Sequence, residues 1–586
     1  MGLLMKVYAS IRPHHNATCS MRFSSPPLAL FCSVVTFSTV WLPTFSTAQE
    51  ATKDPASAPV GGPGPDRPKL VVGIAVDQMR WDFLYKYQER YGAGGFRRLV
   101  GEGFSCENGM IGHLPSYTAV GHATVFTGSV PAIHGITGND WTDQLTGKSM
   151  YCTQDDTVQT VGGTSDDGKM SPRNMLTSTV TDELRIATNY RSKVVGVSLK
   201  DRASILPAGH TATAAYWLED LTGNFISSTY YMNELPEWVQ QFNDAKVGEQ
   251  LLSGEWNLLR PAEEYVQSTR DDAPWEGKFE KEQAAVFPHR VSFTYKMKKE
   301  TIRTTPFGNT LSLRFAKAAV EGYNLGGGPV TDFLTINCAS TDYVGHKFGP
   351  NSMETEDTYL RLDQDLADFF TFLDGRVGKG NYLVFLTADH GVAHTVGYMK
   401  ENRLPSEGWN PKGLVRELNE YLGGKFGEEK LVAGEANYLL NFDLAKIDEK
   451  NLDFTAIKNA AVRWIRKYPG VLFAVDMENL DGAPIPEPLR TMMINGYNSK
   501  RCGSIHVVPN PGWVTGAGKQ GTTHGSWYPY DTHIPVVFMG WGIRHGSSNE
   551  VVYQHDIAPT VAALLHIQMP NGCVGRPIKD VLNKQP

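Results

Sequence analysis

Six aspartate and histidine side chains have the types and spacing of metal ligands. Two stand four residues apart in the segment TDYVGH and two are adjacent in TADHG; the full set is Asp77, Asp342, His346, Asp389, His390 and His524. Carboxylate oxygens combined with imidazole nitrogens suit zinc. The six divide into two groups of three, which leaves open positions typical of catalytic metal. Two such ions about 4 Å apart can bind both the attacking and the leaving oxygen of a phosphoryl transfer.

Each of these side chains also has a simpler structural explanation. Aspartate is common in turns and helix caps. A single histidine is more often a hydrogen-bonded core or surface residue, and the other histidines receive that interpretation, including His394, four residues after His390. The recurrence of aspartate and histidine together is what favours a metal centre.

The segment HLPSYTAVGHATVFTG offers a nucleophile. Its Thr118 stands where a loop containing Pro115 gives way to a predicted helix of small residues. Backbone N–H groups and the helix dipole at such a position favour an alkoxide or a phosphate. Ser116 is the alternative nucleophile, and a simple N-cap is the alternative role for Thr118. Spacing alone does not separate these interpretations.

Four continuous apolar runs are typical of strands buried on both faces of a parallel sheet. They are Leu70–Val76, Asp332–Ser340, Tyr382–Ala388 and Ile534–Gly540. The first three stop at or just before a predicted aspartate ligand. Because open α/β sheets bind ligands at the carboxyl ends of their strands, we expect these aspartates to meet at one edge of the sheet.

An amphipathic helix is predicted between the second and third runs, because apolar residues recur there at helical spacing. These residues are Tyr359, Leu362, Leu366, Phe369, Phe370 and Leu373. A strand, a crossover helix and a second strand form a βαβ unit. We therefore expect an α/β fold with a mostly parallel central sheet and helices on both of its faces.

Residues 1–48 have the pattern of an export signal. Arg22 precedes an uncharged apolar stretch, and a small-residue cleavage site ends at Ala48. A membrane anchor is the alternative, but prolines shorten the apolar stretch below what a bilayer requires. Met21 is an alternative start of the chain. Residues 49–68 are predicted to be a flexible linker, since Pro and Gly are frequent and no periodicity is present.

Residues 69–586 are expected to be a single catalytic domain, because the predicted ligands extend from Asp77 to His524. Two long stretches without a ligand, at about residues 206–308 and 398–511, are interpreted as insertions over the strand ends that form walls or a lid. The first is rich in aromatic residues. Packing is their commoner role, and a pocket for the leaving group is the alternative hypothesis.

The charge balance excludes some classes of function. Lys and Arg total 55 against 62 Asp and Glu, a formal charge of −7, and removal of residues 1–48 with their three basic residues takes it to −10. A general positive field for nucleic acid is therefore absent from the sequence. Without a CxxC pair, a cysteine zinc site is not expected, but two disulfides are permitted by the five cysteines after the signal. These are Cys106, Cys152, Cys338, Cys502 and Cys573.

Seven ordered segments resemble the bacterial PafA-type alkaline phosphatases, members of the alkaline phosphatase superfamily. The segments are VDQMRWD, PSYTAVGHATVFTG, GNDW, LKDR, STDYVGH, TADHG and GTTHGS-x-YPYD-x-HIP. The resemblance runs from about Lys69 to Ile543. It implies an alkaline phosphatase-like α/β/α sandwich with cap-like insertions, a threonine nucleophile, two zinc ions and a monomer.

The resemblance also implies a role for each matching residue. One zinc would be surrounded by Asp77, Asp389, His390 and the Thr118 oxygen, and the other by Asp342, His346 and His524. Thr118 is selected over Ser116. The non-bridging phosphate oxygens would be held by Asn139, Lys200 and Arg202, in keeping with the planar fork of arginine and the compact charge of lysine.

The expected function is hydrolysis of small-molecule phosphate monoesters through a phosphothreonine intermediate, by a periplasmic or secreted enzyme. Lys200 and Arg202 favour a monoester, whose dianion has one more charged oxygen than a diester. The alternatives are a phosphodiesterase or nucleotide pyrophosphatase of the same superfamily, and a non-catalytic metal- or phosphate-binding protein.

Overall fold

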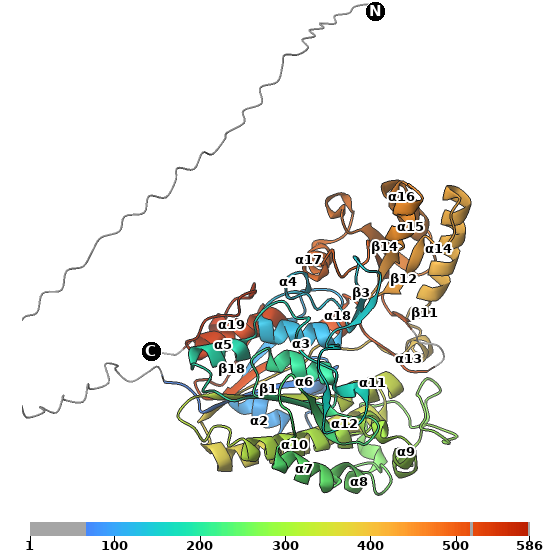
Figure 1. Cartoon of the computed structure of the whole chain (residues 1–586). Helices are drawn as coiled ribbons and strands as arrows, with labels where there is room; N and C mark the ends of the chain where they lie inside the picture. Colours follow the sequence, from blue (N-terminus) through green and yellow to red (C-terminus); the bar gives the residue numbers. More distant parts are fainter. Residues whose placement is uncertain (1–65, 516–519, 584–586) are drawn as a thin grey trace, which may run out of the picture. The chain divides into compact units, whose positions relative to one another are not determined.

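A ten-stranded sheet forms the centre of the protein, for which a computed structural model describes residues 66–515 and 520–583 (Figure 1). The predicted signal and most of the predicted linker lie outside these residues. In spatial order the strands are β18 (Gly546–Tyr553), β2 (Phe104–Met110), β17 (Val536–Gly540), β10 (Tyr382–Thr387), β1 (Leu70–Val76), β9 (Asp332–Cys338), β6 (Val194–Val197), β7 (Ala214–Leu218), β8 (Phe225–Ser228) and β5 (Thr160–Val161).

The expectation of a mostly parallel sheet is confirmed. Strands β10, β1, β9, β6 and β7 pair in parallel as neighbours. Only β17 and β8, among the described strands of this sheet, run against the others. The first three predicted strands are thus neighbours in the order β10, β1, β9, so their carboxyl ends meet at one place on the sheet edge.

The fourth predicted strand differs in direction from the other three. It is β17, and it pairs antiparallel with β10, Val536 lying opposite Thr387. Its amino end therefore lies at the same edge as the carboxyl end of β10. The segment that carries His524 approaches this edge because it precedes β17.

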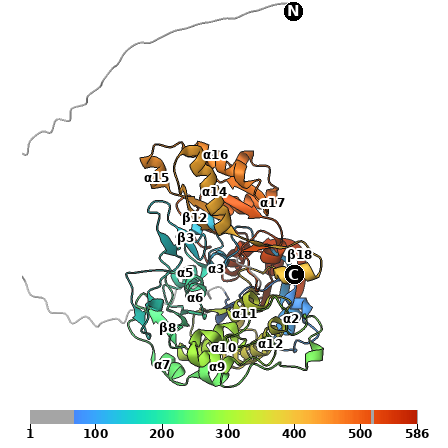
Figure 2. The same ribbon diagram turned by 90° about the vertical axis from the view of Figure 1, so that its right-hand side faces the viewer.

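Helices cover both faces of the sheet, which confirms the layered α/β architecture (Figures 1 and 2). Alternate side chains of β1 point to opposite faces, as a strand requires. Val72 and Ile74 belong to one apolar cluster and Val71 to the other. The first cluster includes α2 (Phe96–Glu102), α10 (Phe307–Gly322) and α12 (Met353–Leu373); the second includes α3 (Thr118–Thr127), α5 (Val180–Ala187), α6 (Asp201–Ala208) and α19 (Ile557–Leu564).

The predicted crossover helix is α12, which connects β9 to β10 after the shorter α11 (Ser340–Phe348). All six apolar residues that predicted it are buried. The helix ends at Leu373, where its apolar pattern ends. The βαβ unit inferred from the apolar periodicity is therefore the one that brings β9 and β10 to the two sides of β1.

The stretch at residues 206–308 is not wholly separate from the sheet. Its first part contributes β7 and β8 to the sheet, and the long segment after β8 lies outside it. Trp217 and Trp256 from this stretch are fully buried, so packing accounts for both.

The stretch at residues 398–511 contains a sheet of its own. This smaller sheet has the order β12, β13, β15, β14 and antiparallel pairing throughout. We call residues 411–509, which contain it, the small lobe; in Figure 1 it is coloured in shades of orange. Its elements are α14 (Pro411–Phe426), β12 (Val432–Ala436), β13 (Leu439–Phe442), α15 (Leu444–Glu449), α16 (Phe454–Ile465), β14 (Val471–Asp476), α17 (Glu487–Gly496) and β15 (Ile505–Pro509).

Shorter elements connect these layers. The helices are α1 (Phe83–Lys86), α4 (Pro131–His134), α7 (Glu237–Asp244), α8 (Val247–Leu251), α9 (Val291–Met297), α13 (Val396–Glu401), α18 (Pro529–Thr532) and α20 (Lys579–Leu582). Two pairs of short strands are β3 (Asp140–Thr142) with β4 (Ser149–Tyr151), and β11 (Glu407–Trp409) with β16 (Trp513–Thr515).

The five cysteines of the described chain are all free thiols. The two disulfides that their number permits do not form, and four of the five are buried singly in the structure. Within residues 66–515 and 520–583, none of the helices combines the length and apolar character needed to cross a membrane.

Replacing Ile74 by alanine tests the buried centre of β1. Ile74 is fully buried, so Ile74→Ala should lower the free energy of unfolding by about 2–5 kcal/mol, through lost burial and the cavity left behind. Leu145→Ala is the matched control, because Leu145 is 80% exposed, and it should change stability by less than about 0.5 kcal/mol. Denaturant unfolding measures both; equal effects would contradict the assignment of β1 to the core.

Candidate active site

Three aspartates meet at the carboxyl ends of three neighbouring strands. Asp77 follows β1 directly, Asp389 comes two residues after β10, and Asp342 lies in the first turn of α11, just beyond β9. The parallel pairing of these strands brings the three carboxylates together, as expected. All three are buried.

Asp77, Asp389 and His390 form the first group of side chains able to hold a metal ion, with ligand atoms within 4.8 Å of one another. His390 Nε2 lies 3.6 Å from Asp77 Oδ1 and 3.3 Å from Asp389 Oδ2. Neither of these carboxylate oxygens has a hydrogen-bond partner, although both are fully buried. A buried, unpaired anionic oxygen is costly, and a cation at this point would remove the cost. The donor set therefore fits a metal ion.

The electrostatics of the first group lead to the same conclusion. Burial, together with the neighbouring Asp77, raises the pKa of the Asp389 carboxyl well above its usual range. Burial lowers the pKa of His390 to about 3, so its imidazole is neutral and able to act as a ligand. A bound cation would stabilise the ionised form of Asp389.

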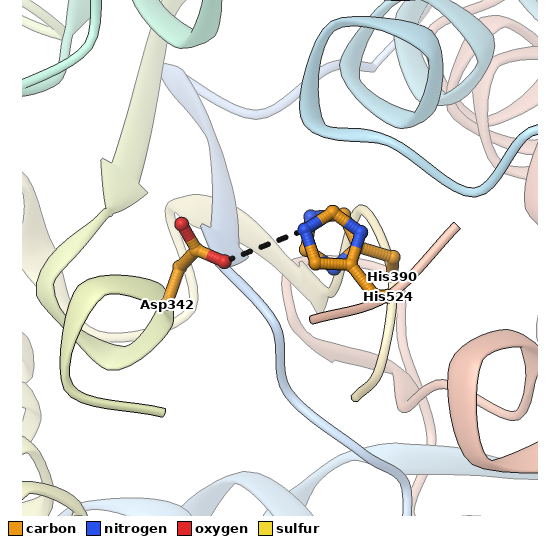
Figure 3. A group of neighbouring side chains, drawn as sticks. All are labelled: Asp342, His390 and His524. Atoms are coloured by element: carbon orange, nitrogen blue, oxygen red, sulfur yellow. Dashed lines mark ion pairs between the residues drawn. The ribbon is translucent and has the colours of Figure 1, made fainter. Parts of the chain in front are cut away.

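Asp342, His390 and His524 form the second group (Figure 3). The rings of His390 and His524 are stacked, with centroids 3.4 Å apart and planes 12° apart. His524 Nε2 lies 3.7 Å from Asp342 Oδ1, the ion pair marked by the dashed line. His390 thus contributes to both groups and links the two halves of the site.

The three histidines are oriented in the same way by the backbone. The Nδ1 of His346, His390 and His524 each lies within 2.9 Å of a backbone carbonyl oxygen. Because a carbonyl only accepts, each Nδ1 carries a proton, and in the neutral imidazole Nε2 keeps a lone pair for a metal ion. Metal-binding histidines are typically held in this way.

His346 lies beside the second group without being one of its three members. Its Nε2 is 3.0 Å from Asp342 Oδ1, and its ring centroid is 5.1 Å from that of His524. Although burial opposes it, Asp342 raises the pKa of His346. The structure therefore brings all six predicted ligands into one site, with His390 rather than His346 grouped with Asp342 and His524.

Thr118 is the first residue of α3, and it is buried. Its Oγ1 lies 3.4 Å from His390 Nε2. The N-cap position belongs to Tyr117, so Thr118 is not the N-cap. Ser116 is engaged elsewhere: its hydroxyl donates to Ser526 O at 2.9 Å.

Lys200 is buried between two of the predicted metal ligands. Its Nζ lies 2.9 Å from Asp77 Oδ2 and 2.6 Å from Asp342 Oδ2. Burial opposes its charge, but Asp342 and Asp77 outweigh burial and raise the pKa of Lys200 above its usual value. The ammonium group thus contributes positive charge at the centre of the site.

The other two predicted phosphate ligands lie beside the start of α3 and α6. Asn139 Oδ1 accepts a hydrogen bond from Ala119 N at 2.9 Å, and Arg202 Nη1 donates to Tyr151 OH at 3.0 Å. The Arg202 Nε has no partner although it is buried. His394 lies away from both groups, with its Nδ1 2.6 Å from Asn351 Oδ1.

The type I phosphodiesterase / nucleotide pyrophosphatase family has a sequence model that matches residues 71–531 of this chain. The chain belongs to this family.

Its relatives include named alkaline phosphatases. It is 52% identical over 520 residues to alkaline phosphatase PafA of Elizabethkingia meningoseptica, covering 88% of this chain and 95% of that protein. To alkaline phosphatase PhoV of Synechococcus elongatus it is 48% identical over 518 residues, covering 88% and 93%. The crystal structure of wild-type PafA matches with a TM-score of 0.87 and 52% identity, covering 88% of this chain and 99% of that one. The resemblance to PafA-type alkaline phosphatases is therefore confirmed.

Several buried residues beside the site have no role in the sequence-based predictions. One is Gln78, whose backbone N donates to Asp389 Oδ1 at 3.1 Å and whose Nε2 donates to Asp342 Oδ1 at 2.7 Å.

Two others are Asn337 and His122. Asn337 of β9 donates to Asp77 Oδ2 at 3.2 Å and accepts from Ser198 Oγ at 2.9 Å. His122 Nε2 lies 3.2 Å from Asn337 Nδ2 and 3.7 Å from Asp389 Oδ2. Each left a signal in the sequence: Asn337 is an amide within an apolar run, and His122 lies one helical turn after Thr118.

Removal of metal should destabilise the purified protein. The unpartnered oxygens of Asp77 and Asp389 then lose their cation. If the free metal concentration was 1,000 times the Kd before removal, the free energy of unfolding should fall by about 4 kcal/mol. Melting temperature before and after dialysis against a chelator measures the effect, and added zinc should reverse it. Asp389→Asn should show a smaller chelator shift. An unchanged melting temperature would contradict the metal assignment.

Proposed function

We propose that this protein is a zinc-dependent alkaline phosphatase that hydrolyses phosphate monoesters to an alcohol and inorganic phosphate. The proposal rests on two buried oxygens without a hydrogen-bond partner, one from Asp77 and one from Asp389. Both lie close to His390, which is next to Thr118. A cation next to a nucleophile is what phosphoryl transfer requires. The alkaline phosphatase names of PafA and PhoV support the same reaction.

Two zinc ions are the proposed cofactors. The first would be held by Asp77, Asp389 and His390 with the oxygen of Thr118, and the second by Asp342, His346 and His524. Carboxylate and imidazole donors in this combination suit zinc. Zinc bound to these residues would supply Lewis-acid stabilisation of negative charge on the attacking and leaving oxygens.

Thr118 is the proposed nucleophile. Its Oγ1 loses its proton and bonds to phosphorus while the bond from phosphorus to the ester oxygen breaks; the leaving oxygen takes up a proton, so the alcohol leaves and a phosphothreonine forms. Water then loses a proton and attacks the same phosphorus, the bond to Thr118 Oγ1 breaks, Thr118 regains its proton, and inorganic phosphate is released. The N-terminus of α3 favours negative charge at this oxygen through its N–H groups and dipole.

Asn139, Lys200 and Arg202 are the proposed ligands of the non-bridging phosphate oxygens. Lys200 is already held between Asp77 and Asp342. The Asn139 carbonyl is used by Ala119 N, which leaves its amide N–H groups to donate. Positive charge and preorganised donors around the three oxygens stabilise the transition state of phosphoryl transfer.

A phosphodiesterase is the second candidate function, because the matching family is described by that activity. Lys200 and Arg202 favour the monoester, whose additional negative oxygen they can meet. A non-catalytic metal-binding protein would not require a hydroxyl beside His390, where Thr118 lies.

We also propose that the enzyme is exported and acts as a monomer on small-molecule phosphate esters. The pattern of residues 1–48 supports export. The net negative charge would repel phosphate esters at long range, so Lys200, Arg202 and the zinc ions must attract them locally.

Replacement of Thr118 by alanine tests the nucleophile. Thr118→Ala should lower kcat/KM for a phosphate monoester by about 10³-fold or more, because the covalent step is lost. Thr118→Ser should retain turnover, since it keeps a hydroxyl at the start of α3. Because Thr118→Ala also removes a proposed zinc ligand, zinc content is measured in both variants, and kcat/KM is compared at equal zinc content. Full turnover by Thr118→Ala, with loss in Ser116→Ala, would identify Ser116 as the nucleophile instead.

Comparison of a phosphate monoester with its methyl diester tests the substrate class. We expect kcat/KM to be higher for the monoester. Arg202→Ala should reduce monoester hydrolysis by about 10-fold or more, because a hydrogen bond between charged groups contributes about 1.5–3 kcal/mol. The same variant should reduce diester hydrolysis less. Faster hydrolysis of the diester by the wild-type enzyme would instead establish the phosphodiesterase alternative.

A further inference from the structure

A hairpin turn of the small lobe contacts a loop that lies outside this lobe. The turn joins β12 to β13, and its two residues, Asn437 and Tyr438, have φ angles of 58° and 63°. Left-handed backbone is common for asparagine but unusual for a residue as large as tyrosine. A two-residue turn between antiparallel strands requires positive φ at both positions, which accounts for the two angles.

Asn437 contacts the loop that carries Asn139. Its Nδ2 donates to Asp140 O at 2.7 Å, across 297 residues of sequence. In Figures 1 and 2, β3, which begins at Asp140, lies beside β12.

Gly138 of the same loop packs closely against the turn. A Cβ atom added to Gly138 would lie 2.2 Å from Asn437 Nδ2 and 2.6 Å from Asp140 O. Only glycine fits at this position, since real Cβ contacts are not so short. The residues on both sides of Asn139 are thus held by Asn437, one by a hydrogen bond and the other by close packing.

Asn139 itself is oriented by the helix that begins with the proposed nucleophile. Its Oδ1 accepts from Ala119 N, and its own backbone oxygen accepts from Cys152 N, both at 2.9 Å. The side-chain amide is therefore turned so that Nδ2 is available to an anion near Thr118.

The same turn also packs near the residue before the nucleophile. Tyr438 belongs to the apolar cluster of the small lobe, and Tyr117 packs against that cluster. The ring of Tyr117 in turn meets the ring of His524 edge-on, with centroids 5.4 Å apart. The hairpin is therefore linked to the start of α3 indirectly in two ways: through the loop of Asn139, which bonds to Ala119, and through the apolar cluster against which Tyr117 packs.

We propose that Asn437 is a positioning residue for the phosphate site: it holds the loop of residues 138–140 so that Asn139 meets a non-bridging oxygen. The inference rests on the proposed role of Asn139 in phosphate binding. Asn437 contacts Gly138 and Asp140, the two neighbours of Asn139 in the chain, and so acts through Asn139. The small lobe then contributes to catalysis by holding residues 138–140, a loop outside the lobe, in position.

Asn437→Gly is the variant that tests this role, because glycine keeps the left-handed turn and removes only the amide. We expect a rise of about 5-fold in the Kd for inorganic phosphate and a similar fall in kcat/KM for a monoester, the effect of one lost hydrogen bond. Asn451→Gly is the matched control: Asn451 has a φ of 51° in an exposed turn of the same lobe. It should leave both quantities unchanged, and zinc content should be the same throughout.

A double-mutant cycle shows whether the effect passes through Asn139. In the Asn139→Ala background, Asn437→Gly should change the Kd for inorganic phosphate by less than about 2-fold, because coupled residues are not additive. A full 5-fold effect in that background, or no effect in the wild-type background, would overturn the proposal. Because phosphate binding is measured directly, the cycle tests Asn437 even if the protein lacks monoesterase activity, which would overturn the proposed function instead.

Discussion

The protein must neutralise negative charge that its fold buries at one point. Asp77, Asp342 and Asp389 lie together at the ends of three neighbouring strands, with one ammonium group, that of Lys200, between them. Two of the carboxylate oxygens have no hydrogen-bond partner. Burying charge in this way is costly unless cations complete the site. The roles proposed for the histidines, Thr118 and the phosphate ligands Asn139, Lys200 and Arg202 all depend on such cations.

The sheet topology explains how residues distant in sequence reach this point. Parallel pairing of β10, β1 and β9 places three aspartates at one edge, since equivalent ends of parallel strands are adjacent. The reversed direction of β17 brings the preceding segment, with His524, to the same edge. Backbone carbonyls then fix the three imidazole rings with Nε2 exposed to the site.

Much of this arrangement could be predicted from the sequence. Strands buried on both faces leave unbroken apolar runs, and β1 has the predicted bounds while β9 and β10 end within two residues of theirs. The stretch at 206–308 includes β7 and β8 because these strands are short, and their apolar residues are not distinguished by pattern from the aromatic-rich sequence that follows. The sharing of His390 between two groups and the contact of Asn437 with Asp140 depend on long-range packing, which leaves no periodic signal.

The most direct test of the account is anomalous X-ray diffraction from crystals of the purified protein, measured on both sides of the zinc absorption edge. We expect two zinc peaks, one bounded by Asp77, Asp389 and His390, and a second beside Asp342 and His524. A single peak, peaks elsewhere, or no anomalous signal at these carboxylates would contradict it.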